Sequence, residues 1–109
     1  MPSSLARKAL LLALSGNAAA GERLIPEIQA GKRDRAYHHA AELLACVFAI
    51  QGKVPEAVQW LRTCAETGMP NYLLFSRDPH LQKIRGSAEF ERFMAEMRTT
   101  WDGYRQRYT

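Results

Sequence analysis

The chain has 109 residues, enough for one domain with a single hydrophobic core and too few for two. Hydrophobic residues make up 47% and charged residues 24%, which excludes a disordered chain and is ordinary for a folded protein. The formal net charge is +4, but the 15 basic residues are spread from Arg7 to Arg107 among 11 acidic ones. A nucleic-acid-binding protein normally gathers its basic residues into a patch, so we expect a mixed, solvated surface.

The first residues predict a helix that Ser3 or Ser4 caps and that ends near Leu14. Arg7 and Lys8, followed by apolar residues, loosely imitate a secretory signal, but the apolar run reaches only about six residues. We interpret the segment as a first helix, with a weak signal peptide as the alternative. No stretch of the sequence approaches the length of a membrane span.

The position of a proline and the hydrophobic periodicity predict the second and third helices. Proline is tolerated only in the first turn of a helix, so Pro26 places the start of the second helix near Ala20 to Arg23. The third helix is predicted over Asp34–Gln51, because its apolar side chains recur with a period of 3.6 residues. These apolar positions are Ala41, Leu44, Ala45 and Phe48.

The fourth helix is predicted to begin at Val54-Pro55-Glu56, with the proline in its first turn and the acid near the positive end of the helix. Its apolar stripe comprises Ala57, Trp60, Leu61, Cys64 and Ala65. Cys46 and Cys64 both fall in such stripes, where cysteine behaves as a small hydrophobe. Two cysteines are too few for a disulfide framework, so we expect a reducing compartment and a cytoplasmic protein.

Two more helices complete the chain. Asp78-Pro79 predicts a short helix through Ile84, and Ser87 caps the last helix. The apolar stripe of the last helix comprises Phe90, Phe93, Met94, Met97, Trp101, Tyr104 and Tyr108. No segment alternates with period two, so we predict an all-α fold of three antiparallel helix pairs.

The centre of the chain combines small and large residues in a pattern that resembles a tetratricopeptide repeat. The residues that carry the resemblance are Leu44, Ala45, Phe48, Gly52, Ala57, Leu61 and Cys64, followed by a turn at Gly68-Met69-Pro70. The segment from Asp78 to Phe90 resembles a closing segment that follows such repeats in bacterial regulatory proteins. The chain departs from the family at Ala41, Cys64 and Pro70.

This resemblance implies a single TPR-like α-α superhelix over residues 1–109, with the last helix as a cap. The central repeat covers about residues 36–69 and the closing segment about residues 70–109. The resemblance also implies that the protein is a protein-protein interaction module, either a stand-alone adaptor or part of a larger regulator. No catalytic residue belongs to the repeat itself.

We expect no enzyme activity, no cofactor and no metal. His38, His39, Cys46 and Cys64 offer suitable donor atoms, but no CxxC or HExxH pair accompanies them. The sequence also contains no GxSxG elbow and no glycine-rich phosphate loop.

Two surfaces are candidates for partner binding. The repeat register places a partner-binding groove along His39, Glu42, Cys46 and Ala49, where small and polar side chains leave room for a peptide or helix. The alternative is that the final helix of the chain itself fills this groove, or that nothing does.

The second surface lies on the C-terminal helix and comprises Arg98, Trp101, Tyr104, Arg105 and Tyr108. Exposed aromatic and arginine side chains are typical interface anchors, which predicts docking or self-association as a homodimer. The alternative is that the aromatic side chains fold back and form the cap. An alternative function is a helical nucleic-acid-binding protein that stacks bases on this basic and aromatic helix, although the spacing favours apolar packing. We expect no membrane partner.

Overall fold

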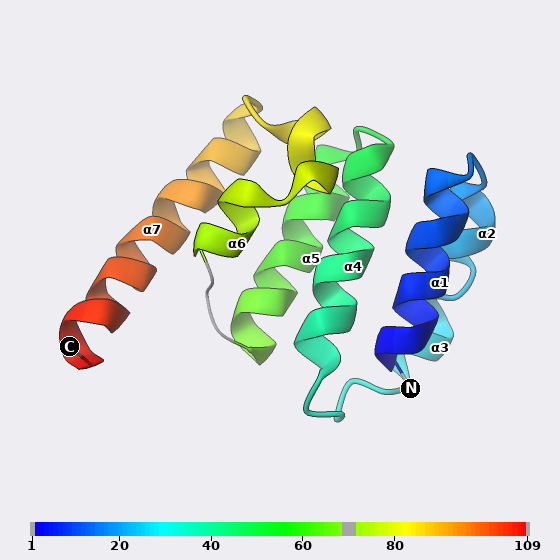
Figure 1. The fold of residues 1–109 in the computed structure, drawn as a ribbon, viewed down its shortest axis with the longest axis horizontal. Helices are drawn as coiled ribbons and strands as arrows, with labels where there is room; N and C mark the ends of the chain where they lie inside the picture. Colours follow the sequence, from blue (N-terminus) through cyan, green and yellow to red (C-terminus); the bar gives the residue numbers. More distant parts are fainter. Residues whose placement is uncertain (1, 69–71, 109) are drawn as a thin grey trace.

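The computed structural model describes residues 2–68 and 72–108, and within these ranges all regular structure is helical (Figure 1). The elements are α1 (Pro2–Leu14), α2 (Ala18–Glu22), α3 (Ile25–Gln29), α4 (Tyr37–Ile50), α5 (Val54–Thr67), α6 (Tyr72–Arg77), the 3-10 helix η1 (Pro79–Ile84) and α7 (Ala88–Tyr108). The all-α prediction is therefore confirmed. No helix in the described part of the chain combines the length and apolar character that crossing a membrane requires.

Helix α1 packs on α4 through small side chains. Ala6, Ala9, Leu10 and Ala13 are buried, and their spacing of three and four residues places them on one face of the helix. The helix already includes Pro2, so Ser3 and Ser4 lie in its first turn and do not cap it. The predicted cap was wrong because proline is itself well suited to the first turn, where its missing N–H costs nothing.

The predicted second helix is divided into α2 and α3, with Leu24 between them. Pro26 lies in the first turn of α3, as predicted, but it has no N–H to donate to the carbonyl of Glu22. A continuous helix would lose that hydrogen bond at the junction. Gly21 is buried where α2 meets α1, and a Cβ atom there would lie 2.6 Å from the carbonyl oxygen of Ala9.

Helix α4 is the central element of the fold. It begins at Tyr37 instead of Asp34, because the Asp34 side chain accepts a hydrogen bond from the backbone N–H of Ala36 (2.8 Å) and forms a turn there. Nine of its 14 residues are buried, and it contacts α1, α5 and η1. Helix α5 returns antiparallel after Gly52, whose φ of 74° is accessible to glycine at little cost, and it begins with Pro55 and Glu56 in its first turn as predicted.

The closing segment contains a helix that the sequence did not predict, α6. Its buried Phe75 packs on Phe93 of α7 with ring centroids 5.8 Å apart. The predicted caps of the following elements are confirmed: Asp78 accepts from the N–H of His80 (2.9 Å), and Ser87 accepts from the N–H of Phe90 (3.3 Å).

The helices form a slab with extents of 42 × 31 × 18 Å, in which α1 and α7 lie at opposite ends (Figure 1). Helix α1 packs with α2 and α3, α4 packs with α5, and α7 packs with α6 and α5. A bidentate ion pair between Arg62 and Glu96, at 2.7 and 3.2 Å, joins α5 to α7. The buried side chains of these elements form one continuous hydrophobic core.

The close approach of α2 to α1 predicts a specific cost for enlarging Gly21. Gly21→Ala places a methyl group against the backbone of Ala9 and should lower the free energy of unfolding by about 1–3 kcal/mol, measured by urea denaturation. The matched control is Gly103→Ala in α7, where a Cβ atom meets nothing within 4 Å. That variant should be neutral or more stable by up to about 1 kcal/mol, and equal destabilisation of both variants would contradict the packing.

Candidate functional site

A cleft of about 360 Å³ lies between α1 and α4. We call it the α1–α4 cleft; it is lined by Ser3 and Arg7 of α1 and by His39, Glu42 and Leu43 of α4. Glu42 and Leu43 are half-buried, whereas Arg7 and His39 are exposed. The imidazole rings of His39 and His38 are in contact, with centroids 4.1 Å apart.

The structure places only part of the predicted groove at this cleft. His39 and Glu42 line it, but Cys46 is 1% exposed and Ala49 is fully buried, so these two side chains are not available to a partner. The prediction needs this correction because the chain's own closing segment covers α4 where the groove was expected to continue: η1 packs directly on α4. The alternative drawn from the sequence was that the final helix fills the groove, whereas in the structure η1 packs on α4 there.

The carboxylate of Asp78 connects the closing segment to α4. One oxygen, Oδ1, accepts the N–H of His80 (2.9 Å), and the other, Oδ2, accepts the thiol of Cys46 (3.4 Å). The carboxyl group of Glu42 lies close enough to that of Asp78 for the two to interact. Arg85 holds the same turn from outside by donating to the backbone carbonyls of Ser76 and Asp78, at 3.0 and 2.7 Å.

Glu42 therefore belongs both to the cleft and to this carboxyl pair. Burial raises the pKa of Glu42 to about 7, assisted by the hydrogen bond to Asp78 and by the negative charge of Asp78. Near neutral pH about half of the molecules therefore carry a proton on Glu42. The cleft thus changes its charge within the physiological pH range.

The two thiols are protected from ionisation. Burial raises the pKa of the Cys46 thiol strongly, and the charge of Asp78 and its hydrogen bond act in the same direction. Burial also raises the pKa of Cys64 to about 12, with a smaller contribution from the charge of Glu42. Since only the thiolate is an effective nucleophile, neither cysteine is activated for catalysis.

The predicted docking surface on the C-terminal helix lies at the far end of the slab from the cleft (Figure 1). Arg98 and Arg105 are exposed on α7. Trp101 is half-buried, and its Nε1 atom is buried without a hydrogen-bond partner. The side chains of Tyr104 and Tyr108 lie outside the described part of the structure, so the predicted surface is placed only in part.

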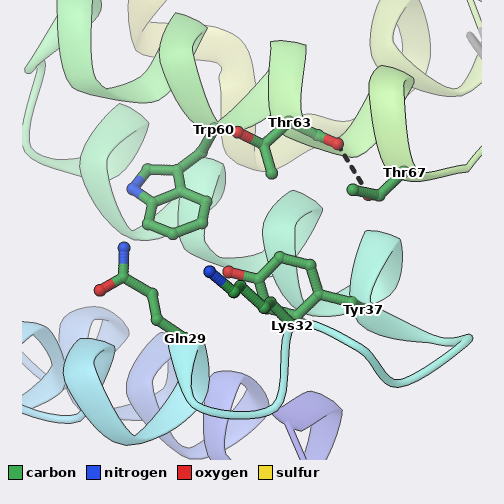
Figure 2. A pocket seen from close by; sticks show the side chains of 6 residues that line it. All are labelled: Gln29, Lys32, Tyr37, Trp60, Thr63 and Thr67. Carbon is green, nitrogen blue, oxygen red and sulfur yellow. Dashed lines mark hydrogen bonds between the residues drawn. The ribbon is translucent and has the colours of Figure 1, made fainter.

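A larger cavity, of about 540 Å³, was not anticipated from the sequence (Figure 2). We call it the Trp60 cavity; it is lined by Gln29, Lys32, Tyr37, Trp60, Thr63 and Thr67. The apolar stripe of the fourth predicted helix had assigned Trp60 to the core, and Gln29, Lys32 and Tyr37 come from other segments of the chain. No motif could have signalled this site, because it forms only when α3, α4 and α5 pack together.

Among the described residues, no three histidine, cysteine, aspartate or glutamate side chains are grouped in a way that could hold a metal ion. Compared with protein-family models, with curated proteins and with solved structures, the chain matches none. The resemblance to tetratricopeptide repeats consequently rests on the residues of the chain alone.

The pKa of Glu42 predicts how stability depends on pH. Between pH 4.5, the ordinary pKa of a glutamate, and about 7, the folded chain binds more protons than the unfolded chain, so stability falls as the pH rises through this window. Glu42→Gln keeps a neutral hydrogen-bonding group at every pH and should remove up to about 3 kcal/mol of this loss. Urea denaturation of both proteins at pH 5, 6, 7 and 8 measures the difference.

The control for this experiment is Glu27→Gln, which changes an exposed carboxylate on α3. It should reproduce the pH dependence of the wild-type protein. Parallel stability curves for Glu42→Gln and wild type would contradict the raised pKa of Glu42.

Burial of both thiols predicts slow chemical modification. In the folded protein, Cys46 and Cys64 should react with a disulfide reagent such as DTNB only at the rate of unfolding, and promptly in 6 M guanidinium. A Ser4→Cys variant introduces an exposed thiol as control and should label one cysteine immediately. Rapid labelling of the wild-type protein under native conditions would show that η1 does not cover α4 stably.

Proposed function

We propose that the protein is an interaction module of the tetratricopeptide-repeat type, which binds an acidic segment of a partner protein in the α1–α4 cleft. The observation that carries this proposal is the charge of the cleft. Arg7 makes no ion pair among the described residues, and it lies beside the exposed imidazole of His39 and the hydroxyl of Ser3. An arginine in such a position presents several N–H donors to a carboxylate at once.

Among the described residues, Glu42 is the one acid that lines the cleft, and it opposes the binding of an acidic ligand only weakly. Its pKa of about 7 means that it is neutral in about half of the molecules at neutral pH and in nearly all of them at pH 6. When protonated, it adds an O–H donor in place of a negative charge. An acidic ligand is therefore expected to bind more tightly at pH 6 than at pH 8.

The size of the cleft supports a short segment as the ligand. Ser3 and Arg7 are four residues apart on α1, which corresponds to about 6 Å along the helix axis. An extended chain advances about 3.3 Å per residue, so a few residues fill the cleft. Such a small contact area is typical of weak, transient recognition. The pairing of helices around α4 supports the repeat-type arrangement, in which first helices line the binding face.

Selection from a library of displayed twelve-residue peptides on the immobilised protein tests this function. We expect enrichment of peptides rich in aspartate and glutamate, with affinities that fluorescence anisotropy then measures. Arg7→Glu should weaken the selected peptides at least tenfold, since it places a negative charge where the ligand needs a donor.

The control is Arg23→Glu, which makes the same change of charge at an exposed position outside the cleft. It should leave affinity nearly unchanged, and circular dichroism should show both variants folded. A selection without enrichment of acidic residues, or equal loss in both variants, would refute binding in the cleft.

A further inference from the structure

The Trp60 cavity shares no residue with the α1–α4 cleft. Figure 2 shows Gln29, Lys32 and Tyr37 on one side of it and Trp60 on the other, with Thr63 and Thr67 along α5. Its volume of about 540 Å³ lies within the range of clefts that hold small molecules.

Two aromatic side chains from different helices supply the apolar part of the lining. Tyr37, in the first turn of α4, is 5% exposed and is fixed in the core. Trp60 of α5 is half-buried and packs on the same core, which leaves part of its indole open to the cavity. The open part of the Trp60 indole, held in this way, offers a preorganised surface for a planar ring, which stacks favourably on aromatic groups, and Tyr37 borders this surface.

The polar groups of the lining favour an anion. Lys32 is exposed and makes no ion pair among the described residues, and no acidic side chain lines the cavity. Burial raises the pKa of Tyr37, so its hydroxyl group remains a donor. The hydroxyls of Thr63 and Thr67 already donate to backbone carbonyls of α5, at 3.2 and 2.7 Å. The donors that remain for a ligand come from Gln29, Lys32 and Tyr37.

We propose that the Trp60 cavity binds a small aromatic carboxylate, with its ring against the indole of Trp60 and its carboxylate at the Lys32 amine, beside Tyr37. A cationic ligand would meet the charge of Lys32 with no acid in the lining to compensate for it. A neutral aromatic ligand would fill the same space but would leave the ammonium group without a partner. The charge of the cavity therefore distinguishes the acid from its neutral analogue.

The experiment uses 2-naphthoate as the probe and the full-length ¹⁵N-labelled protein. Titration followed by NMR should shift the indole N–H of Trp60 and the side-chain amide of Gln29, while the indole N–H of Trp101, on α7 and outside the cavity, stays in place. Naphthalene-2-methanol, which has the same ring system without the charge, should bind at least fivefold more weakly.

Lys32→Met keeps much of the aliphatic side chain and removes the charge, so it should weaken 2-naphthoate at least fivefold and leave the neutral analogue unchanged. Lys83→Met, on η1 and outside the cavity, is the matched control and should bind 2-naphthoate as the wild type does. Because Lys32 and Lys83 are both exposed, neither substitution disturbs the core. Equal affinity for acid and alcohol, no effect of Lys32→Met, or equal shifts at Trp60 and Trp101 would each overturn the proposal.

Discussion

The burial of α4 on three sides is the constraint from which the rest of the structure follows. Helices α1 and α5 and the 3-10 helix η1 all pack on it, and its buried residues include Leu44, Val47 and Phe48. A helix enclosed in this way has little surface left for polar side chains. His38, His39 and Glu42 occupy what remains, and for this reason the cleft forms at the first turns of α4 and not along its whole length.

The carboxyl pair of Glu42 and Asp78 marks the boundary between this open part of α4 and the covered part. Asp78 caps η1 and accepts the Cys46 thiol, so the closing segment is attached to α4 through an acid that favours a protonated Glu42. Two unprotonated carboxylates side by side would repel each other in a half-buried position. The proton on Glu42 that relieves this repulsion also removes a negative charge from the cleft, which links the charge of the cleft to the packing of the closing segment.

Much of this fold is predictable from local patterns in the sequence, because the signals of α4, α5, η1 and α7 are local. A period of 3.6 residues, a proline in the first turn and an aspartate or serine cap each depend on neighbouring residues only. The division between α2 and α3 depends on Pro26 together with the approach of Gly21 to α1, which is a tertiary contact. Helix α6 is short, and its Phe75 is buried because it packs on Phe93 of another helix. No local periodicity in the sequence therefore predicts α6.

The candidate sites show the same distinction between features that local sequence patterns predict and features that depend on tertiary contacts. Periodicity places His39 and Glu42 on one face of a helix, but it does not show that the closing segment covers α4 at Cys46, since the covering residue Asp78 comes 32 positions later. The Trp60 cavity needs three segments to be packed before any of its lining exists, so sequence periodicity interprets Trp60 as a core residue.

The two sites are connected through the start of α4, where Tyr37 faces the Trp60 cavity and His39 faces the cleft. Coupling between them would require an element with two alternative arrangements. Helix α4 contains neither glycine nor proline and is packed against three neighbours, so it offers no hinge between these residues. The effect of the proposed ligand of the Trp60 cavity is therefore expected on the segment that precedes α4, where the turn at Asp34 is held by one short hydrogen bond to Ala36. Because α4 offers no hinge that would carry this effect to His39, we expect the two proposed sites to act independently.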